Sequence, residues 1–447
     1  MDFIKEIEKN QEQLVLKIQE LVRIDSVLEE HPDSKDAPFG EGIKKSLEYV
    51  LNLGKELGFK TKNVNNVAGH IEYGEGKEII GVLCHVDVVP ADGVWKYPPF
   101  SATIENNRIY GRGTNDDKGP VICSLFALKL LKDLNIKLNK RVRLIIGTDE
   151  ETAWRGINEY LKNEEMPDMG FSPDADFPLI YGEKGILSFD VVGKNDDIDL
   201  IEFYSGKRYN VVPDNAYIKY NKDLQKEYND YLQVNNLKGE IKDNKYIAIG
   251  KSAHAMMPEA GINSSLILAN FLKNYSRNKL VQFMSDKLND TRVKDMGLDF
   301  SDPEMKDLTM NLGIVRIDKN SSRIGLNFRY PINIDINKFI ENFKKQAKEY
   351  DLDIVVKENK GPNYVDKNSD LIKVLHNAYI EYTGDTKTEI MTIGGGTYAR
   401  AIKNAVAFGI LFPGEEELAH QANEYINIDS AKKATAIIAK AIMDLGK

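Results

Sequence analysis

The chain has 447 residues, enough for two or three domains, each with a hydrophobic core. Apolar residues make up 42% of it and charged residues 29%, which excludes a disordered, collagen-like or coiled-coil protein. It carries 60 Lys and Arg against 69 Asp and Glu, a net charge of −9, so a small-molecule ligand is favoured over nucleic acid or an anionic membrane.

The first 20 residues spread charges among apolar positions at helical spacing, so they predict an amphipathic helix and not a signal peptide. No later run approaches the ~18 consecutive apolar residues that a membrane-spanning helix needs. The two cysteines, Cys84 and Cys123, are expected to be buried thiols, because such sparing use is typical of reducing compartments. These features predict a cytoplasmic protein without a membrane partner.

Helical spacing predicts helices at residues 3–23 and 41–57, and compact runs of branched residues predict strands at 78–86 and 141–147. Another helix is predicted at 120–134, after the glycine-rich segment GRGTNDDKG. Alternating helices and buried strands are typical of an α/β domain with a mostly parallel central sheet flanked by helices.

From about residue 186 the pattern changes to short strands and helices, among them 264–280 and 337–349. After about residue 366 the earlier pattern returns, with a helix, a glycine loop, an apolar strand and a closing helix. The simplest organisation is one α/β domain made of residues 1–185 and 367–447, interrupted by an inserted α+β domain at 186–366.

Imidazole and carboxylate side chains follow several of the predicted strands and turns. His85 ends one strand and Asp87 lies two residues on, so both point to the same side of an extended segment. Similar candidates follow in later segments: Asp116, Asp117, Asp149, Glu150, Glu151, Asp174, Asp176 and His420. Taken singly, each has an ordinary explanation as a core histidine, a solvated turn or a helix-capping acid.

Together these positions favour a metal centre. In open α/β sheets, ligands bind at the carboxyl edge of the strands, and adjacent carboxylates repel one another unless a cation compensates them. Imidazole and carboxylate oxygen suit zinc, manganese or cobalt, while the lack of clustered cysteines argues against a structural zinc site. The residues therefore indicate a metallohydrolase.

Seven motifs, in this order, resemble the co-catalytic zinc exopeptidases, a family that includes carboxypeptidase G, acetylornithine deacetylase and carnosinase. The chain most resembles the PepV-like bacterial dipeptidases, over nearly its whole length. The motifs are LCHVDVVP, YGRGTNDDKGP, GTDEET, GFSPDADFPLIYGEKG, GKSAHAMMPE, GGGTYAR and PGEEELAHQANEYI.

The resemblance implies two divalent metal ions per chain, with Zn²⁺ favoured and Mn²⁺ or Co²⁺ as alternatives. His85 and Asp174 would bind one ion, Glu151 and His420 would bind the other, and Asp116 would bridge the two. The three carboxylates would carry a charge of −3 against +4 from two divalent ions. A bridging hydroxide would therefore make the centre neutral, which favours deprotonation of the bound water. The peptide bond after Asp116 would be cis, as in the family.

The resemblance also implies roles in catalysis and substrate binding. Asp87 would orient the first metal-binding histidine, and Glu150 would be the general base. The inserted domain would be a lid with hinges near residues 186 and 366, from which His254 and Asn210 stabilise the oxyanion in a monomer. Arg329 would bind the substrate carboxylate, with the backbone of the glycine loop beside it. That loop comprises Gly394, Gly395, Gly396 and Thr397, with Arg400 close by.

We therefore expect a dinuclear metal-dependent dipeptidase that hydrolyses short peptides with a free C-terminal carboxylate, using a metal-bound hydroxide. An N-acyl-amino-acid deacylase of the acetylornithine deacetylase or desuccinylase type is the alternative, because the two differ only in the pocket for the acyl portion. A noncatalytic phosphate-ligand binding protein with GGGT and GRGT as anion cradles is more remote, because the chain lacks the GxxxxGK[ST] and GxGxxG patterns.

Overall fold

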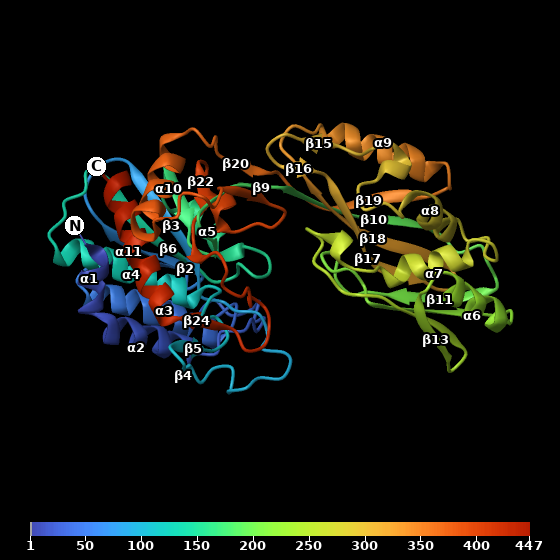
Figure 1. Ribbon diagram of the computed structural model, residues 1–447, viewed down its shortest axis with the longest axis horizontal. Coiled ribbons are helices and arrows are strands. Elements are labelled where there is room, and N and C mark those ends of the chain that lie inside the picture. The colour runs from blue at the N-terminus through green and yellow to red at the C-terminus, as the bar shows by residue number, and fades with distance from the viewer. Residues whose placement is uncertain (1) are drawn as a thin grey trace. The chain divides into compact units, whose positions relative to one another are not determined.

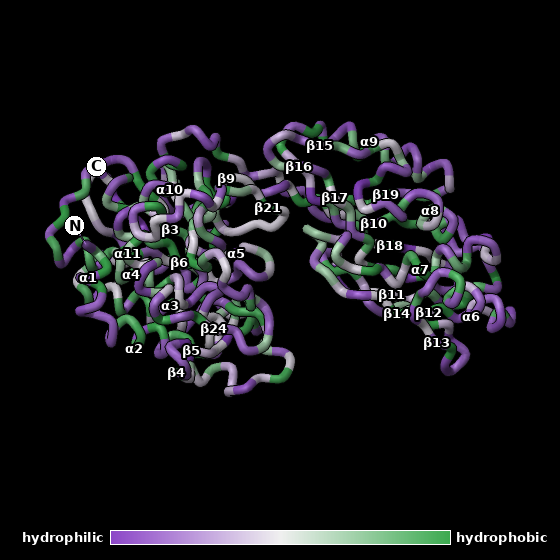
Figure 2. Tube along the Cα trace, viewed as in Figure 1, coloured by the Kyte–Doolittle hydropathy of each residue, from purple (hydrophilic) through white to green (hydrophobic). Residues whose placement is uncertain are grey.

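The computed structural model describes residues 2–447 and divides the chain into two compact units. The first unit comprises the chain up to Gly182, Tyr364–Met391 and Gly396–Lys447, and the second comprises Glu183–Asn363 and Thr392–Gly395. Each unit has a hydrophobic core of its own. Hydrophobic stretches alternate with hydrophilic ones along the chain in both units (Figure 2).

The first unit is built on a sheet with the strand order β1-β2-β6-β3-β7-β22-β9-β20, in which β21 also pairs with β9. Neighbours among β6, β3, β7 and β22 run parallel, whereas β2 runs antiparallel to β6. The strands are β1 (Lys60–Val64), β2 (Ala68–Tyr73), β3 (Ile79–His85), β6 (Arg141–Gly147), β7 (Met169–Ser172), β9 (Ile180–Glu183), β20 (Asn363–Tyr364), β21 (Met391–Ile393) and β22 (Ala405–Ala407).

Alternate side chains of the central strands face two different layers, which explains why β3 is apolar up to His85 and why β6 is apolar apart from Arg141 and Arg143. Val82 and Cys84 belong to a large cluster with most of the helices, whereas Leu83 belongs to a smaller cluster on the other face. The helices of the large cluster are α1 (Phe3–Glu8), α2 (Gln11–Val22), α3 (Glu41–Glu56), α4 (Lys118–Asp133), α10 (Asp370–Thr383) and α11 (Ile428–Leu445) (Figure 1). The smaller cluster contains α5 (Arg155–Asn163) and the 3₁₀ helix η3 (Tyr398–Ala401).

Two short sheets carry loops of the first unit. One has the order β24-β5-β4, from β4 (Thr103–Glu105), β5 (Arg108–Tyr110) and β24 (Tyr425–Asn427). The other joins β8 (Ala175–Asp176) in parallel to β23 (Ile410–Leu411). Segments far apart in sequence are thereby fixed side by side next to the predicted ligands.

The second unit contains an antiparallel sheet with the order β13-β14-β12-β11-β17-β18-β10-β19. Its core includes Phe189 of β10 and Phe328 of β18, whose rings stack with centroids 4.9 Å apart. The strands are β10 (Gly185–Lys194), β11 (Leu200–Ser205), β12 (Asn215–Tyr220), β13 (Lys238–Lys242), β14 (Lys245–Ile249), β17 (Thr309–Ile317), β18 (Ser321–Tyr330) and β19 (Asp353–Lys360). The other elements are α6 (Gln225–Val234), α7 (Ser264–Leu272), α8 (Lys279–Lys287), α9 (Ile336–Lys348), η1 (Pro258–Ala260), η2 (Lys294–Met296), β15 (Ser301–Asp302) and β16 (Lys306–Asp307).

The predicted α/β fold with a mostly parallel central sheet and a further α+β part is confirmed. Two predicted helices are each divided in two. The helix expected at 3–23 is interrupted at Lys9 and Asn10, and the one expected at 264–280 ends at Leu272, after which Asn278 caps α8. Both cysteines are buried free thiols, as expected. No helix within residues 2–447 combines the length and apolarity needed to cross a membrane.

Candidate metal centre

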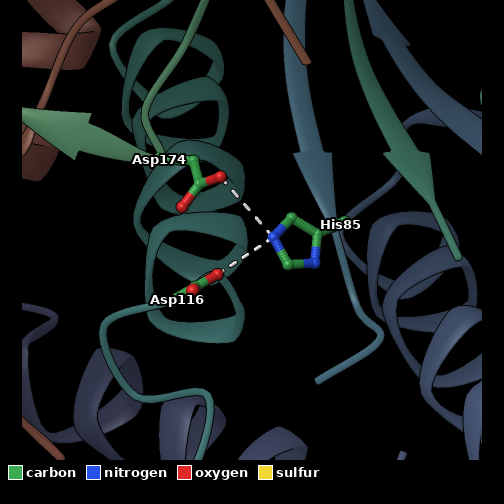
Figure 3. A group of neighbouring side chains, drawn as sticks. All are labelled: His85, Asp116 and Asp174. Atoms are coloured by element: carbon green, nitrogen blue, oxygen red, sulfur yellow. Dashed lines mark ion pairs between the residues drawn. The ribbon is translucent and has the colours of Figure 1, made fainter. Parts of the chain in front are cut away.

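His85 lies at the end of β3, where two carboxylates from separate loops converge on one nitrogen of its ring (Figure 3). His85 Nε2 is 3.1 Å from Asp116 Oδ1 and 3.6 Å from Asp174 Oδ2. Asp116 precedes α4, and Asp174 lies between β7 and β8. The imidazole is 1% exposed, so this group of acceptors lies at the buried carboxyl edge of the sheet.

A second group of candidate metal ligands lies around the other carboxylate oxygen of Asp116, Oδ2. His420 Nε2 lies 3.0 Å from Asp116 Oδ2 and 3.0 Å from Glu151 Oε2. The candidate ligand atoms within each of the two groups all lie within 4.8 Å of one another. Asp116 is therefore shared by two clusters, each of which contains one imidazole and two carboxylates.

The state of the His85 ring follows from its contacts. Its Nδ1 lies 2.9 Å from the carbonyl oxygen of Asp87 and 3.4 Å from a carboxylate oxygen of the same residue. Both atoms can only accept a hydrogen bond, so Nδ1 carries the proton in the neutral ring and donates it. The lone pair of Nε2 then points toward Asp116 and Asp174, which is the arrangement that a metal-binding histidine needs.

The donor set fits divalent metal ions. Burial and then the charge of Asp116 raise the pKa of Glu151 to about 7 and that of Asp174 to about 6. These carboxylates are thus crowded together away from water, a situation that a cation relieves. Imidazole nitrogen with carboxylate oxygen, and no thiolate, is a set that Zn²⁺, Mn²⁺ or Co²⁺ accepts.

The acidic triplet after β6 divides into residues with different surroundings. Asp149 is buried and receives hydrogen bonds from the guanidinium of Arg155 at 2.7 and 2.9 Å and from its backbone N–H at 2.9 Å, so it satisfies the first backbone N–H of α5. Glu151 faces His420, and its backbone N–H donates to Asp87 Oδ2 at 3.1 Å. Burial raises the pKa of Glu150, whose carboxylate receives no hydrogen bond from residues 2–447.

In the second unit, His254 and Asn210 lie on neighbouring segments. An antiparallel bridge joins Val211 to His254, and the backbone N–H of Ala255 donates to the carbonyl of Asn210 at 2.9 Å. The backbone N–H of Met256 donates to His254 Nδ1 at 3.3 Å. Because Nδ1 accepts a hydrogen bond, Nε2 carries the proton in the neutral ring and can donate it.

Arg329 is 5% exposed and holds part of the glycine loop. Its Nε donates to Asn327 Oδ1 at 2.9 Å, and its Nη1 donates to the carbonyl of Gly394 at 2.8 Å. A side chain at position 394 would meet Met256, because a Cβ there would lie 2.6 Å from the Cβ of that methionine. Gly394 and Gly395 belong to the second unit, whereas Gly396 and Thr397 begin the last segment of the first.

Residues 81–444 match the sequence pattern of Peptidase family M20/M25/M40. The chain belongs to this family. It is 43% identical over 467 residues to a protein of Bacillus subtilis (strain 168) named "Putative dipeptidase YtjP", with 100% of both chains covered. It is 41% identical over 455 residues to a "Putative dipeptidase" of Staphylococcus epidermidis, with 97% of both covered.

Solved structures share the fold of this M20 peptidase. Human carnosine dipeptidase 1 has a TM-score of 0.62 at 15% identity, covering 99% of this chain and 98% of that one. The M20 family metallo-carboxypeptidase Sso-CP2 from Sulfolobus solfataricus has a TM-score of 0.60 at 21% identity, covering 96% and 98%. The chain is therefore a metallopeptidase, a hydrolase that acts on peptide bonds, and the alternative of a noncatalytic phosphate-binding protein is wrong.

Two more side chains adjoin the candidate metal centre of this M20 peptidase. Asp117, a candidate from the sequence, accepts the backbone N–H of His85 on its Oδ2 at 2.8 Å, and the expected cis bond between Asp116 and Asp117 is confirmed. The ring of Tyr398 packs edge-on against His85, with centroids 6.0 Å apart. Tyr398 was not singled out, because nothing in the sequence marks it as a neighbour of His85.

Proposed function

We propose that this M20 peptidase is a dipeptidase that uses two divalent metal ions to hydrolyse short peptides with a free C-terminal carboxylate. The observation that carries the proposal is Asp116, whose two oxygens face His85 and His420 separately. Two relatives that align over nearly their whole length bear the name dipeptidase, which supports this substrate class. Zn²⁺ is the ion we favour, with Mn²⁺ or Co²⁺ as alternatives.

In this proposal Asp116 contributes to both metal sites. His85 and Asp174 complete one site, and Glu151 and His420 complete the other. When bound, such ions polarise the scissile carbonyl group and lower the pKa of water. Asp87 orients His85 through Nδ1 and holds the backbone of Glu151, so one residue positions a ligand of each site.

Glu150 is the proposed general base. It lies directly before Glu151 in the sequence, and its carboxylate receives no hydrogen bond from residues 2–447, so both oxygens are available to a proton. A carboxylate placed beside the reacting water can take its proton and deliver it to the leaving amine. Asp149 does not suit this task, because Arg155 and the start of α5 occupy its oxygens.

His254 is the proposed donor to the oxyanion of the tetrahedral intermediate, with Asn210 beside it. The protonated Nε2 that its backbone contact implies is suited to donating a hydrogen bond to a developing negative charge. We also propose that residues 186–366 act as a lid. Arg329, Gly394, Gly395, Gly396 and Thr397 are the proposed binding region for the substrate carboxylate.

A substrate panel tests the proposal. Dipeptides, tripeptides, and N-acetyl and N-succinyl amino acids would be offered to the protein loaded with Zn²⁺, Mn²⁺ or Co²⁺. We expect dipeptides to be cleaved fastest and a chelator to abolish cleavage. Hydrolysis confined to the N-acyl amino acids would contradict the dipeptidase and favour the deacylase.

We further propose that the enzyme works as a cytoplasmic monomer. The two buried free thiols are compatible with a reducing compartment. Light scattering after size-exclusion chromatography would test the monomer, for which a mass near 50.5 kDa is expected. A mass of twice that value would refute it.

A further inference from the structure

We propose that Glu424 is a positioning residue for the metal centre, which keeps the loop of Asp116 in the shape that lets this aspartate face both histidines. The inference rests on the proposed metal sites. It concerns a residue that lies in none of the candidate ligand groups and that acts through the backbone of another segment.

The Glu424 side chain is 0% exposed, and both of its carboxylate oxygens receive hydrogen bonds. Oε1 accepts from the backbone N–H of Asn115 at 2.8 Å and from that of Asp116 at 3.2 Å. Oε2 accepts from Arg112 Nη1 at 2.7 Å and from the backbone N–H of Gly113 at 3.1 Å. All four partners are donors, so one carboxylate satisfies three backbone N–H groups in the loop that ends at Asp116.

The residues around this loop restrict its backbone conformation and the position of the Arg112 side chain. Gly113 has a φ of 86°, a conformation that favours glycine, and a Cβ there would lie 2.9 Å from Val88. Arg112 is 1% exposed, donates a further hydrogen bond to the carbonyl of Pro90 and lies over the ring of Trp95. The guanidinium is thus fixed on several sides and holds the Glu424 carboxylate in one place.

Glu424 also connects the two segments that supply ligands to the second metal site. It follows His420 by four residues and directly precedes β24, which pairs with β5 through Tyr425 and Tyr110. The backbone N–H of Gly111 donates to the Glu424 carbonyl at 2.9 Å, which extends this pairing. One residue therefore fixes the segment of His420 to the loop that begins at Gly111 and carries Asp116.

Glu424→Gln is the substitution that this geometry singles out. A glutamine amide has one acceptor oxygen and one NH₂ group, so in either orientation its NH₂ faces two of the four donors. At least two hydrogen bonds are lost, and the loop must shift to relieve the contact between donors. Because Asp116 is shared, a shift of its loop moves it relative to both His85 and His420.

A purely structural buried ion pair is the competing explanation. It predicts a lower melting temperature for Glu424→Gln with unchanged metal affinity of the folded protein. The positioning role predicts weaker metal binding at temperatures where the variant is fully folded. Partners that orient metal ligands typically change affinity by about 10- to 100-fold when they are substituted.

The experiment is a titration of Zn²⁺, and separately of Mn²⁺, into the metal-free full-length protein, followed by calorimetry and by competition with a chromophoric chelator. Circular dichroism would establish that each variant is folded. Glu415→Gln is the matched control, because Glu415 also accepts a backbone N–H, from Phe412 at 2.9 Å, and contacts Ser430, away from the loop of Asp116. Glu424→Asp, which keeps the charge but is one methylene shorter, serves if the glutamine variant does not fold.

We expect Glu424→Gln to bind at least one ion about 10- to 100-fold more weakly than the wild type, Glu424→Asp to show a smaller loss, and Glu415→Gln to show none. Wild-type affinity in the folded Glu424 variants, or an equal loss in Glu415→Gln, would overturn the positioning role alone. A wild-type protein that binds no divalent ion would instead refute the proposed metal centre, and this inference with it.

Discussion

His70 makes the stability of the first unit depend on pH. It lies in β2, is 6% exposed, and its Nδ1 lies 2.9 Å from the hydroxyl oxygen of Tyr160. Burial, followed by the positive charge of Arg143, lowers the pKa of His70 to about 4. The folded protein therefore keeps this imidazole neutral at pH values where an unfolded chain already protonates it.

The size of the effect follows from the difference between the two pKa values. An unfolded histidine titrates near 6.5, so the folded state binds fewer protons than the unfolded state between about pH 6.5 and pH 4. The free energy of unfolding must then fall as the pH drops through this interval, by about 3 kcal/mol in total and by about 2 kcal/mol by pH 5. Above pH 7 the contribution of His70 is fully present and no longer changes.

Urea denaturation of the metal-free protein between pH 7.5 and pH 5 would measure this dependence. His70→Gln removes the titrating group, so its free energy of unfolding should fall less steeply than that of the wild type over this range. His31→Gln is the control substitution of a histidine on the surface, because the His31 side chain is 55% exposed. Parallel profiles for the wild type and His70→Gln would refute the reasoning.

Three further perturbations test the chemistry of the metal centre. Glu150→Gln should lower kcat by about 100- to 10,000-fold while metal content, measured by mass spectrometry, stays at two ions per chain; loss of metal would argue against a general base. His254→Ala should lower kcat by about 100- to 1,000-fold with metal content and melting temperature unchanged, and an undiminished kcat would contradict its role on the oxyanion. Removing metal with a chelator should lower the melting temperature. Each occupied site stabilises the folded state by about 2.7 kcal/mol when the free metal concentration is 100 times the Kd of the site. An unchanged melting temperature would show that no ion binds the folded state.

The sequence predicted the central strands well because of their surroundings. β3 and β6 are covered on both faces, so most of their side chains are apolar; the polar exceptions are His85 in β3 and Arg141 and Arg143 in β6. The divided helices were harder to foresee, because apolar spacing continues through the break at Lys9 and Asn10. An asparagine that caps a helix, such as Asn278 before α8, looks in the sequence like any polar residue of a helix surface.

The candidate ligands were predictable for a different reason. His85 is the last residue of an apolar strand, and Glu151 follows one within a few residues, so each lies at the edge of the sheet where the other candidate ligands meet. Glu424 and Arg112 could not be found in this way. In the sequence they resemble charges on a surface, and their complete burial results from the pairing of two segments about 300 positions apart. Arg329 was expected to bind a substrate carboxylate, and its contact with Gly394 became visible only in the folded chain.

Anomalous diffraction from crystals grown with Zn²⁺ tests the central claim most directly. Data collected on either side of the zinc absorption edge should show two peaks about 3.5 to 4 Å apart, with a carboxylate oxygen of Asp116 next to each. His85 and Asp174 should flank one peak, and Glu151 and His420 the other. A single peak, or peaks that do not contact Asp116, would contradict a pair of ions that share this aspartate.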